Sequence, residues 1–183
     1  MWYCVLEGER GAANALAARG ITLMANSGPL RGRLARRSGR PVLDGIGGID
    51  LEVFRPDPSA RTAGKLTVLA YSRRSRPKKG TDLLVPVRWV LNPAQDEPAR
   101  LYASADVVIA AEGKAGWCNT AIEAMSAGAA VVCTPSGTRD FARHGETAWV
   151  VPVRHPWFLA RGRAYRRGSV TPTCAWYLPF LSA

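Results

Sequence analysis

Residues 106–134 read DVVIAAEGKAGWCNTAIEAMSAGAAVVCT. Two apolar runs, 106–111 and 129–134, flank an Ala-rich stretch that we expect to form a helix. Short apolar runs without polar alternation are typical of strands that are buried on both faces, as in a parallel sheet. The stretch therefore predicts a strand–helix–strand unit, which is the building block of an α/β protein.

The same alternation extends along most of the chain. We predict further strands at 3–6, 21–25, 41–43, 65–71, 87–91 and 148–152, and further helices at 10–19, 27–37, 81–84 and 96–103. The predicted fold class is α/β, with a Rossmann-like parallel sheet and helices on both faces. Residues 54–64, FRPDPSARTAG, are rich in Pro and Gly and are interpreted as a linker. Only 15 residues separate the strands at 65–71 and 87–91, which is short for a parallel crossover.

Composition narrows the class of protein. Hydrophobic residues make up 47% of the chain, which is ample for a packed core, and no apolar run is long enough to predict a membrane-spanning helix. The four cysteines are far apart, so we expect buried, reduced thiols, with neither a disulfide framework nor a zinc site. A net charge of +11, from 21 Arg and 4 Lys, favours an anionic partner: a nucleotide, a nucleic acid or an acidic membrane surface. A GC-rich genome that uses Arg for any surface cation explains this bias equally well.

The segment GWCN, residues 116–119, precedes the helix expected after the strand at 106–111. A helix start offers unpaired N–H groups and a partial positive charge, both of which suit phosphate, and Gly116 permits close approach of a ligand. We expect Asn119 or Thr120 to be the N-cap. A second helix start is predicted at 135–140, PSGTRD, where Gly137 and Thr138 would offer two more backbone donors.

Individual side chains in this segment allow two interpretations. Glu123 lies three residues after Thr120, the spacing of a capping box, so its carboxylate either caps the helix or contacts a ligand. Trp117 is more often a packing residue than a ligand platform, and Cys118 more often a buried residue than a nucleophile. Neither His144 nor His155 has an obvious partner, so the sequence supports no catalytic triad and no metal site.

The loop SRRSRPKKGTD, residues 72–82, follows the strand at 65–71 and holds five cations between Arg73 and Lys79. If that strand is parallel to the others, the loop lies at the ligand-binding edge of the sheet, where Arg and Lys bind phosphate. On charge alone, a solvated loop or a nonspecific nucleic-acid-binding loop is equally consistent. No interleaved aromatic residues accompany the cations, which weakens the nucleic-acid interpretation.

Taken together, these stretches resemble the retaining GT-B glycosyltransferases of the glycogen-synthase-like group (glycosyltransferase group 1, family 4-like). GWCNTAIEAMSAGAAVVCTPSGTRDFARHGETAWVVP resembles the family pattern EGW.N…EAMA.G.PVV.T..GG..E….G.TG.LV.P. LYASADVVIAA resembles its LY..ADV unit, and KLTVLAYSRRSRPKKGTDLL resembles the strand and GR…KG loop that open its second domain. Residues 25–56 resemble the end of its first domain, with Gly47 in place of a common Asn.

The resemblance implies roles for named residues. Arg74 and Lys79, five positions apart, would hold the donor diphosphate together with Gly116 and Trp117, and Glu123 would contact the nucleotide ribose. Other donor contacts would come from Cys118, Asn119 and Thr120. The family's second glutamate, near the transferred sugar, normally lies eight positions before the first, where this chain has Ala115. Glu112, three residues upstream, is therefore the candidate catalytic residue.

The resemblance also divides the chain. Residues 1–56 would be a remnant of the N-terminal acceptor domain with the interdomain segment. Residues 57–160 would be the nucleotide-sugar-binding Rossmann-like domain, internally shortened near 84–87, and 161–183 an unpatterned tail. On this reading the chain is a fragment, and strands missing from the first domain would leave apolar surface exposed.

The predicted function is transfer of a sugar from a nucleotide-diphosphate donor to an unknown acceptor with retention, by an enzyme of impaired activity. A non-catalytic nucleotide-sugar-binding module is the alternative, followed by a basic nucleic-acid-binding protein. The resemblance implies no cofactor and no metal, because cations and helix-end N–H groups would stabilise the leaving diphosphate. We expect a cytoplasmic protein with no nucleic-acid partner, either free or peripheral at the inner face of the membrane.

Overall fold

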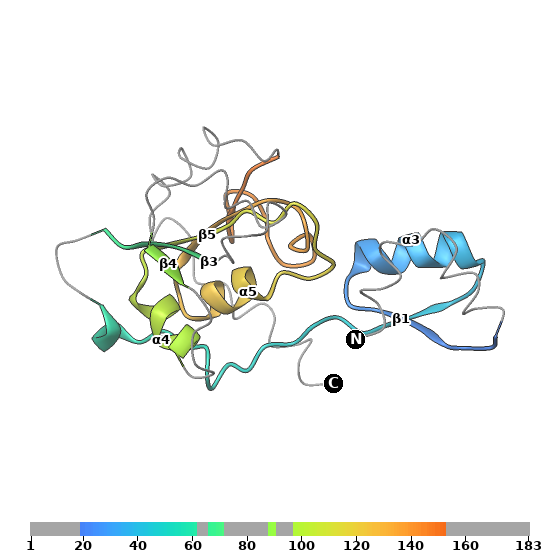
Figure 1. The fold of residues 1–183 in the computed structure, drawn as a ribbon, viewed down its shortest axis with the longest axis horizontal. Helices are drawn as coiled ribbons and strands as arrows, with labels where there is room; N and C mark the ends of the chain where they lie inside the picture. The colour runs from blue at the N-terminus through green and yellow to red at the C-terminus, as the bar shows by residue number, and fades with distance from the viewer. Residues whose placement is uncertain (1–18, 62–65, 72–87, 91–96, 153–183) are drawn as a thin grey trace. The chain divides into compact units, whose positions relative to one another are not determined.

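The computed structural model describes residues 19–61, 66–71, 88–90 and 97–152. The chain divides into two compact units, residues 1–48 (unit 1) and 49–183 (unit 2), and each is described by itself. Figure 1 shows the elements of both units in chain order. Predictions for residues 3–6, 81–84 and 161–183, and for all but the end of the helix at 10–19, concern residues outside the described ranges.

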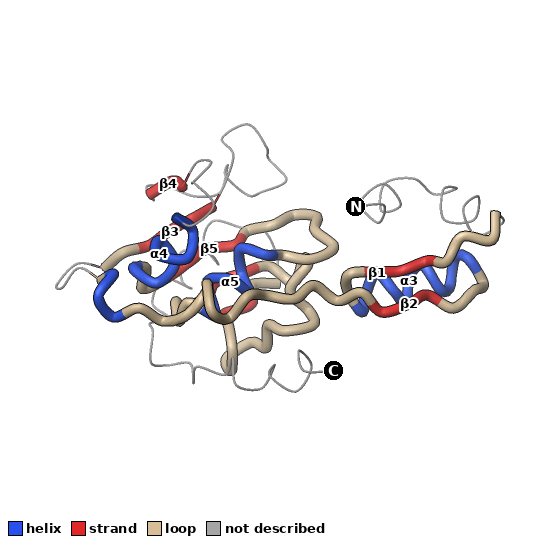
Figure 2. Tube along the Cα trace, turned by 90° about the horizontal axis from the view of Figure 1, so that it is seen from below, coloured by secondary structure: helices blue, strands red, loops and turns tan. Residues whose placement is uncertain are grey.

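Unit 1 contains a strand–helix–strand motif, as predicted. Strands β1 (Leu23–Ala25) and β2 (Val42–Asp44) pair in parallel and lie side by side, with α3 (Gly28–Ser38) packed along them (Figure 2). The helix starts after an extended Ser27, tolerates Pro29 in its first turn, and buries Leu30 and Leu34. On the strands, Leu23 and Ala25 are buried, whereas the paired residues Met24 and Leu43 are 54% and 53% exposed. One face of this small sheet is therefore covered and the other carries exposed apolar side chains.

Unit 2 is built on a five-stranded sheet in which every pair of neighbouring strands is parallel. The strands are β3 (Val68–Tyr71), β4 (Arg88–Val90), β5 (Val107–Ala110), β6 (Ala130–Cys133) and β7 (Trp149–Val150), in the order β4-β3-β5-β6-β7. The predicted parallel α/β sheet is confirmed. The connection from β3 to β4, which is short for a parallel crossover, nevertheless joins parallel strands.

Helices α4 (Glu97–Ser104) and α5 (Asn119–Ser126) pack on the same face of this sheet. Side chains alternate across the central strands: Val108 and Val131 lie in the core cluster with both helices, and Val107 and Val132 lie in a second cluster on the opposite face. All four are fully buried, which explains why the strands read as unbroken apolar runs. No helix in the described ranges packs on the second face.

Specific hydrogen bonds and a glycine fix the conformation of the β5–α5–β6 segment. The Asp106 carboxylate accepts a hydrogen bond from the Thr67 amide at 2.8 Å, which ties the start of β5 to β3. Helix α5 ends at Ser126 with Ala127 as its C-cap, and the next residue, Gly128, has a φ of 79°, in the left-handed region that favours glycine. The amides of Gly128 and Ala129 return to the carbonyls of Met125 and Ala124, the C-terminal motif that allows an immediate turn into β6.

Part of the predicted linker is packed structure. Phe54 and Ala60 lie against the core cluster of unit 2, and Phe54 contacts the Tyr102 ring with centroids 6.4 Å apart. Between them, Pro58–Ala60 forms a short 3-10 helix, η1, capped by Asp57. Hydrogen bonds from Ser59 lower the pKa of Asp57. The interpretation of 54–60 as a linker is therefore wrong, because apolar side chains at Phe54 and Ala60 gain burial against α4. The assignment of domains to residues 1–56, 57–160 and 161–183 stays a prediction.

The helix predicted at 135–140 is also wrong, since residues 136–141 form turns. Gly137 has a φ of 75°, which no right-handed helix accommodates, and the amides of Phe141 and Ala142 both return to the Thr138 carbonyl. Across the described residues, no helix is long and apolar enough to cross a membrane.

Candidate functional site

The carboxyl ends of β3, β5 and β6 lie at one edge of the sheet. Parallel pairing aligns Ala70 with Ile109, and Ala110 with Cys133, so the carboxyl ends of the three strands are neighbours. The chain passes from β3 to β4 on one side and later to β5 on the other, so strand order reverses between β3 and β5. Open α/β sheets bind ligands outside the strand ends at such a reversal, because the flanking loops diverge there.

The residues that follow β5 lead directly into α5, and the N-cap of this helix is Cys118. The prediction of Asn119 or Thr120 as N-cap is wrong, because the helix begins earlier than the side-chain pattern indicates. A tertiary contact supplies the reason: the Cys118 amide donates to the Gly137 carbonyl at 2.9 Å, while the Cys118 carbonyl accepts from the Ala121 amide. No side chain caps this end.

Glu123 therefore does not belong to a capping box. With Cys118 as N-cap, Glu123 is the fifth residue of the helix, beyond the position from which a carboxylate reaches back to the cap amide. The side chain is half-buried, and burial raises the pKa of its carboxyl group. The capping interpretation is wrong, and the ligand interpretation of Glu123 remains.

Several backbone amides at the start of α5 have no hydrogen-bond partner among the described residues. The amides of Gly116, Trp117, Asn119 and Thr120 make no hydrogen bond to any residue that the structure describes. The amides of Ala115 and Cys118, in contrast, are bonded to Ser136 and Gly137. Within the described part of the chain, the helix start therefore combines N–H groups that have no partner with the positive end of the helix dipole.

Trp117 has a packing role at this helix start. Its ring meets the Phe141 ring edge-on, with centroids 5.1 Å apart, and it packs against the core cluster. The indole Nε1 is buried and makes no hydrogen bond to the described part of the chain. The packing interpretation is supported, and its contact with a diphosphate stays a prediction.

Glu112, the candidate catalytic residue, follows β5 at the same edge and is only 6% exposed. Its backbone carbonyl accepts a hydrogen bond from the Thr134 hydroxyl at 2.5 Å. Ala115 stands where the resemblance predicts a second glutamate, and its amide donates a hydrogen bond to the Ser136 hydroxyl at 2.8 Å. A catalytic role for Glu112 stays a prediction.

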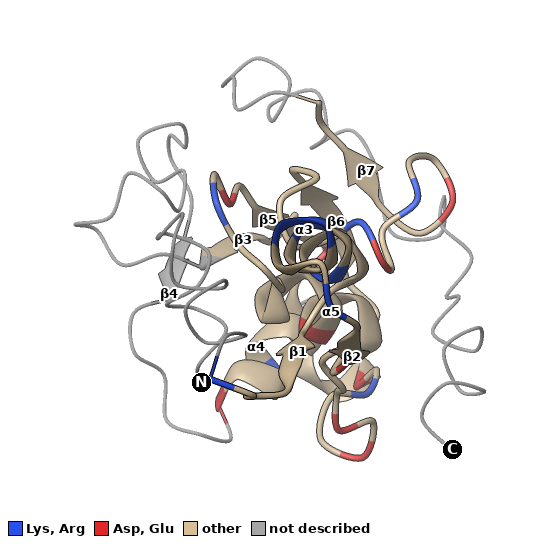
Figure 3. Ribbon diagram, turned by 90° about the vertical axis from the view of Figure 1, so that its right-hand side faces the viewer, with Lys and Arg blue, Asp and Glu red and all other residues tan. Residues whose placement is uncertain are grey.

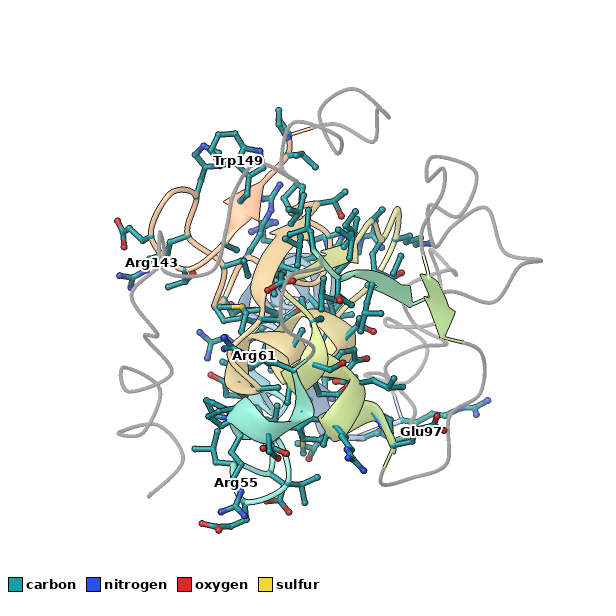
Figure 4. The ribbon with its side chains drawn as sticks, turned by 90° about the vertical axis from the view of Figure 1, so that its left-hand side faces the viewer. Arg55, Arg61, Glu97, Arg143 and Trp149 are labelled. Carbon is teal, nitrogen blue, oxygen red and sulfur yellow. The ribbon has the colours of Figure 1, made fainter. Side chains whose placement is uncertain are left out.

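The remaining candidates are structural or lie outside the described residues. Burial raises the pKa of Cys133 to about 12, and neither Cys133 nor Cys118 forms a disulfide. The Nδ1 atom of His144 accepts a hydrogen bond from the Val150 amide, and its ring lies 4.6 Å from that of Trp149, which is labelled with Arg143 in Figure 4. Within the described ranges, no group of three or more His, Cys, Asp and Glu side chains is placed to hold a metal. Arg74, Lys79 and His155 lie outside these ranges.

Among residues 19–48, the described part of unit 1, charged side chains are concentrated on α3. Figure 3 shows its arginines in blue, and the helix carries no acidic residue. Arg31 pairs with Asp44 on β2 at 2.9 Å, with both side chains about half exposed. Arg36 and Arg37, in the last turn, complement the negative end of the helix dipole. These cations therefore have a local structural use whatever else they bind.

The sequence interpretation missed Thr134 and Ser136 as site-forming groups near the helix start, and it expected Gly137 only as a backbone donor to a ligand. Each bonds to the loop between β5 and α5, residues 111–118, which we call the β5–α5 loop. A signal was present, because Ser-Gly after Pro135 is a turn sequence that directly follows a buried strand. What the sequence did not show is that this turn packs on the neighbouring loop.

Comparison with known families identifies a family to which the chain belongs. The family model described as Glycosyl transferases group 1 matches residues 65–162, more than half of the chain. A search of curated proteins finds no match.

Several solved structures resemble the fold over much of this chain. HepE of Anabaena, in complex with UDP-glucose, superposes with a TM-score of 0.73 at 18% identity, covering 85% of this chain and 57% of HepE. Sucrose-phosphate synthase from Thermosynechococcus elongatus gives a TM-score of 0.68 at 20% identity, covering 80% of this chain and 50% of that enzyme. The C-terminal domain of LpcC, a group 1 family glycosyl transferase from Francisella tularensis, gives 0.54 at 18% identity, covering 64% of this chain and 87% of that domain. The chain thus spans about half the length of the first two proteins.

Proposed function

The chain belongs to the glycosyl transferases of group 1, and from that membership we propose that it binds a nucleotide-diphosphate sugar at the carboxyl edge of the unit 2 sheet. The proposed reaction is transfer of the sugar to an acceptor hydroxyl with retention of configuration. HepE, which shares the fold, was solved with UDP-glucose, so uridine nucleotides are the first donors to test.

The parallel pairing of β3 with β5 is the observation that carries the proposal. It brings Tyr71, the last residue of β3, to the same edge as the unpaired amides at the start of α5. Arg74 is three residues beyond Tyr71, so chain length alone keeps its Cα within about 11 Å of the end of β3. A diphosphate at this edge is thus within reach of cations from one loop and N–H groups from the next.

These groups suit the chemistry of the transfer. When the bond from the anomeric carbon to the diphosphate oxygen breaks, both electrons stay with that oxygen, and negative charge builds up on the leaving group. Arg74, Lys79 and the helix-end amides would stabilise this charge in place of a metal ion. The acceptor oxygen then bonds to the anomeric carbon on the same face, and the acceptor proton leaves with the diphosphate.

Glu123 is the proposed ribose contact. Its carboxylate is half-buried on the first turns of α5 and has no capping role, so a pair of hydroxyl donors would compensate its desolvation. The loss of the capping interpretation makes the role testable. Glu123→Gln should weaken nucleotide binding without the loss of stability that a cap residue would show.

A nucleotide-sugar-binding module without turnover is the second candidate. All the groups assigned to the donor lie in unit 2, and transfer needs a second surface that positions the acceptor and excludes water. Donor consumption separates the two functions: a chain that binds UDP-glucose and never releases UDP in the presence of candidate acceptors is the module.

The proposal is tested by isothermal titration of the full chain with UDP and with GDP. We expect saturable binding that is strongly weakened in Arg74→Ala and in Lys79→Ala. Arg55→Ala is the matched control, because Arg55 is an exposed cation of unit 2 that projects away from the sheet (Figure 4). Equal losses of nucleotide affinity in all three variants would show that the effect depends only on net charge. Tight, salt-sensitive RNA binding without nucleotide binding would replace the proposal with a nucleic-acid function.

A further inference from the structure

We propose that the Ser136 hydroxyl is a positioning group for the donor diphosphate: it holds the β5–α5 loop in the shape that leaves its free amides facing the ligand. This inference deepens the proposed function and rests on it. It concerns a residue that touches no ligand itself and acts through the loop it holds.

Three hydrogen bonds join the β5–α5 loop to the turn that follows β6. At the start of the loop, the Thr134 hydroxyl donates to the Glu112 carbonyl at 2.5 Å. In the middle, the Ala115 amide donates to the Ser136 hydroxyl at 2.8 Å. The third bond, at the helix start, runs from the Cys118 amide to the Gly137 carbonyl. The loop is thus attached at its beginning, middle and end to one neighbouring turn.

The turn that follows β6 also packs tightly against the β5–α5 loop at Gly137. A Cβ atom added to Gly137 would lie 2.9 Å from the Ala115 Cβ, 2.9 Å from the Cys118 nitrogen and 3.0 Å from the Trp117 carbonyl carbon. Contacts this short are not tolerated without displacement of backbone. The absence of a side chain at Gly137 is therefore what allows Ser136 to reach Ala115.

These attachments determine which amides remain for a ligand. Ala115 and Cys118 donate inward to the turn, whereas Gly116, Trp117, Asn119 and Thr120 donate to no described residue. The free donors stand between and beyond the two bonded ones. A loop held in this way needs no reorganisation when an anion binds, which raises affinity without a new contact.

The predicted role of Cys118 changes accordingly. Its side chain is 2% exposed and lies in the core cluster, and its amide is bonded to Gly137. We infer that Cys118 shapes the helix start and does not contact the donor. Ser136 differs, because its hydroxyl is a single replaceable link in the middle of the loop.

The experiment compares Ser136→Ala with Ser136→Thr and with a matched control, Ser104→Ala. The Ser104 hydroxyl donates to the Leu101 carbonyl at 2.7 Å on α4, so its removal costs a similar hydrogen bond away from the loop. Each variant of the full chain is titrated with UDP, unfolded in urea, and examined by NMR for amide exchange at Ala115 and Cys118.

We expect the UDP dissociation constant to rise roughly three- to tenfold in Ser136→Ala, the range that one lost neutral hydrogen bond gives. Stability in urea should match that of Ser104→Ala, whose UDP affinity should not change. Exchange should accelerate at Ala115 but not at Cys118. Ser136→Thr, which keeps a hydroxyl, should restore both affinity and protection of Ala115.

The other outcomes overturn the proposal. Faster exchange at Ala115 with unchanged UDP affinity would show that the loop is ordered by Ser136 but not used by the ligand. Failure of Ser136→Ala to fold, when Ser104→Ala folds, would show a purely structural role. If the unsubstituted chain binds neither UDP nor GDP, the proposed function fails and the positioning role fails with it.

Discussion

The close contact between the two loops makes Gly137→Ala a quantitative test of the structure. Two costs add at this position. A non-glycine residue at a φ of 75° destabilises the folded state by about 1–2 kcal/mol. The added methyl group must also displace Ala115 and the Cys118 backbone, and overpacking of this kind destabilises by about 1–3 kcal/mol. We therefore expect a loss of about 2–5 kcal/mol in the free energy of unfolding.

Gly145→Ala separates the two costs. Gly145 also lies in unit 2 with a φ of 80°, but nothing stands within 4 Å of its added Cβ. Gly145→Ala should therefore lose only the free energy of unfolding that comes from its backbone conformation, about 1–2 kcal/mol. The loss of unfolded-state entropy on replacing Gly by Ala is common to both variants and cancels in the comparison.

Urea unfolding of both variants, followed by tryptophan fluorescence, gives the difference. We expect Gly137→Ala to be less stable than Gly145→Ala by about 1–3 kcal/mol, with similar dependence on urea concentration. Gly137→Ala should also bind UDP more weakly, since the β5–α5 loop must move. Equal stability of the two variants would refute the packing of the turn against the loop.

Three further predictions follow from the described contacts. Glu123→Gln should be more stable than the unsubstituted chain at pH 7. Burial raises the folded pKa of Glu123 above 4.5, so the stability of the unsubstituted chain falls as pH rises through that folded pKa. In thermal melts the advantage of the variant should disappear below pH 4, and a constant difference across pH would contradict this. Cys133, with a pKa of about 12, should not react with iodoacetamide at pH 8 in the folded chain and should react only in urea, as measured by peptide mapping. Labelling of the folded chain at the rate of the unfolded chain would show that the thiol is accessible. Arg31→Ala should change the stability of unit 1 by about 1 kcal/mol or less, because its ion pair with Asp44 is half exposed; a loss above about 2 kcal/mol would indicate a stronger role.

The sequence predicted the order of elements well, because burial on both faces leaves a direct trace in composition. The strands β5 and β6 are unbroken apolar runs whose residues are all buried, and the parallel sheet follows from that pattern. The helix predicted at 27–37 matches α3 (Gly28–Ser38) to within one residue at each end. These features depend on residues that are neighbours in the sequence.

The details of the site could not be predicted, because they depend on contacts between distant segments. Cys118 became the N-cap through a bond to Gly137, nineteen positions later, and that bond removed Glu123 from the expected capping box. Residues 135–140 have helix-start composition, yet the left-handed Gly137 turns them onto the β5–α5 loop. Phe54 and Ala60, within a stretch rich in Pro and Gly, were not recognised as core contacts.

Nitrogen–proton NMR spectra of the labelled chain, recorded during titration with UDP, test the proposed site at the level of single amides. We predict saturable shifts of Gly116, Trp117, Asn119 and Thr120, with no change at Gly145 in unit 2 or at Gly39 in unit 1. Saturable UDP binding that leaves those four amides unmoved would contradict a diphosphate site at the start of α5.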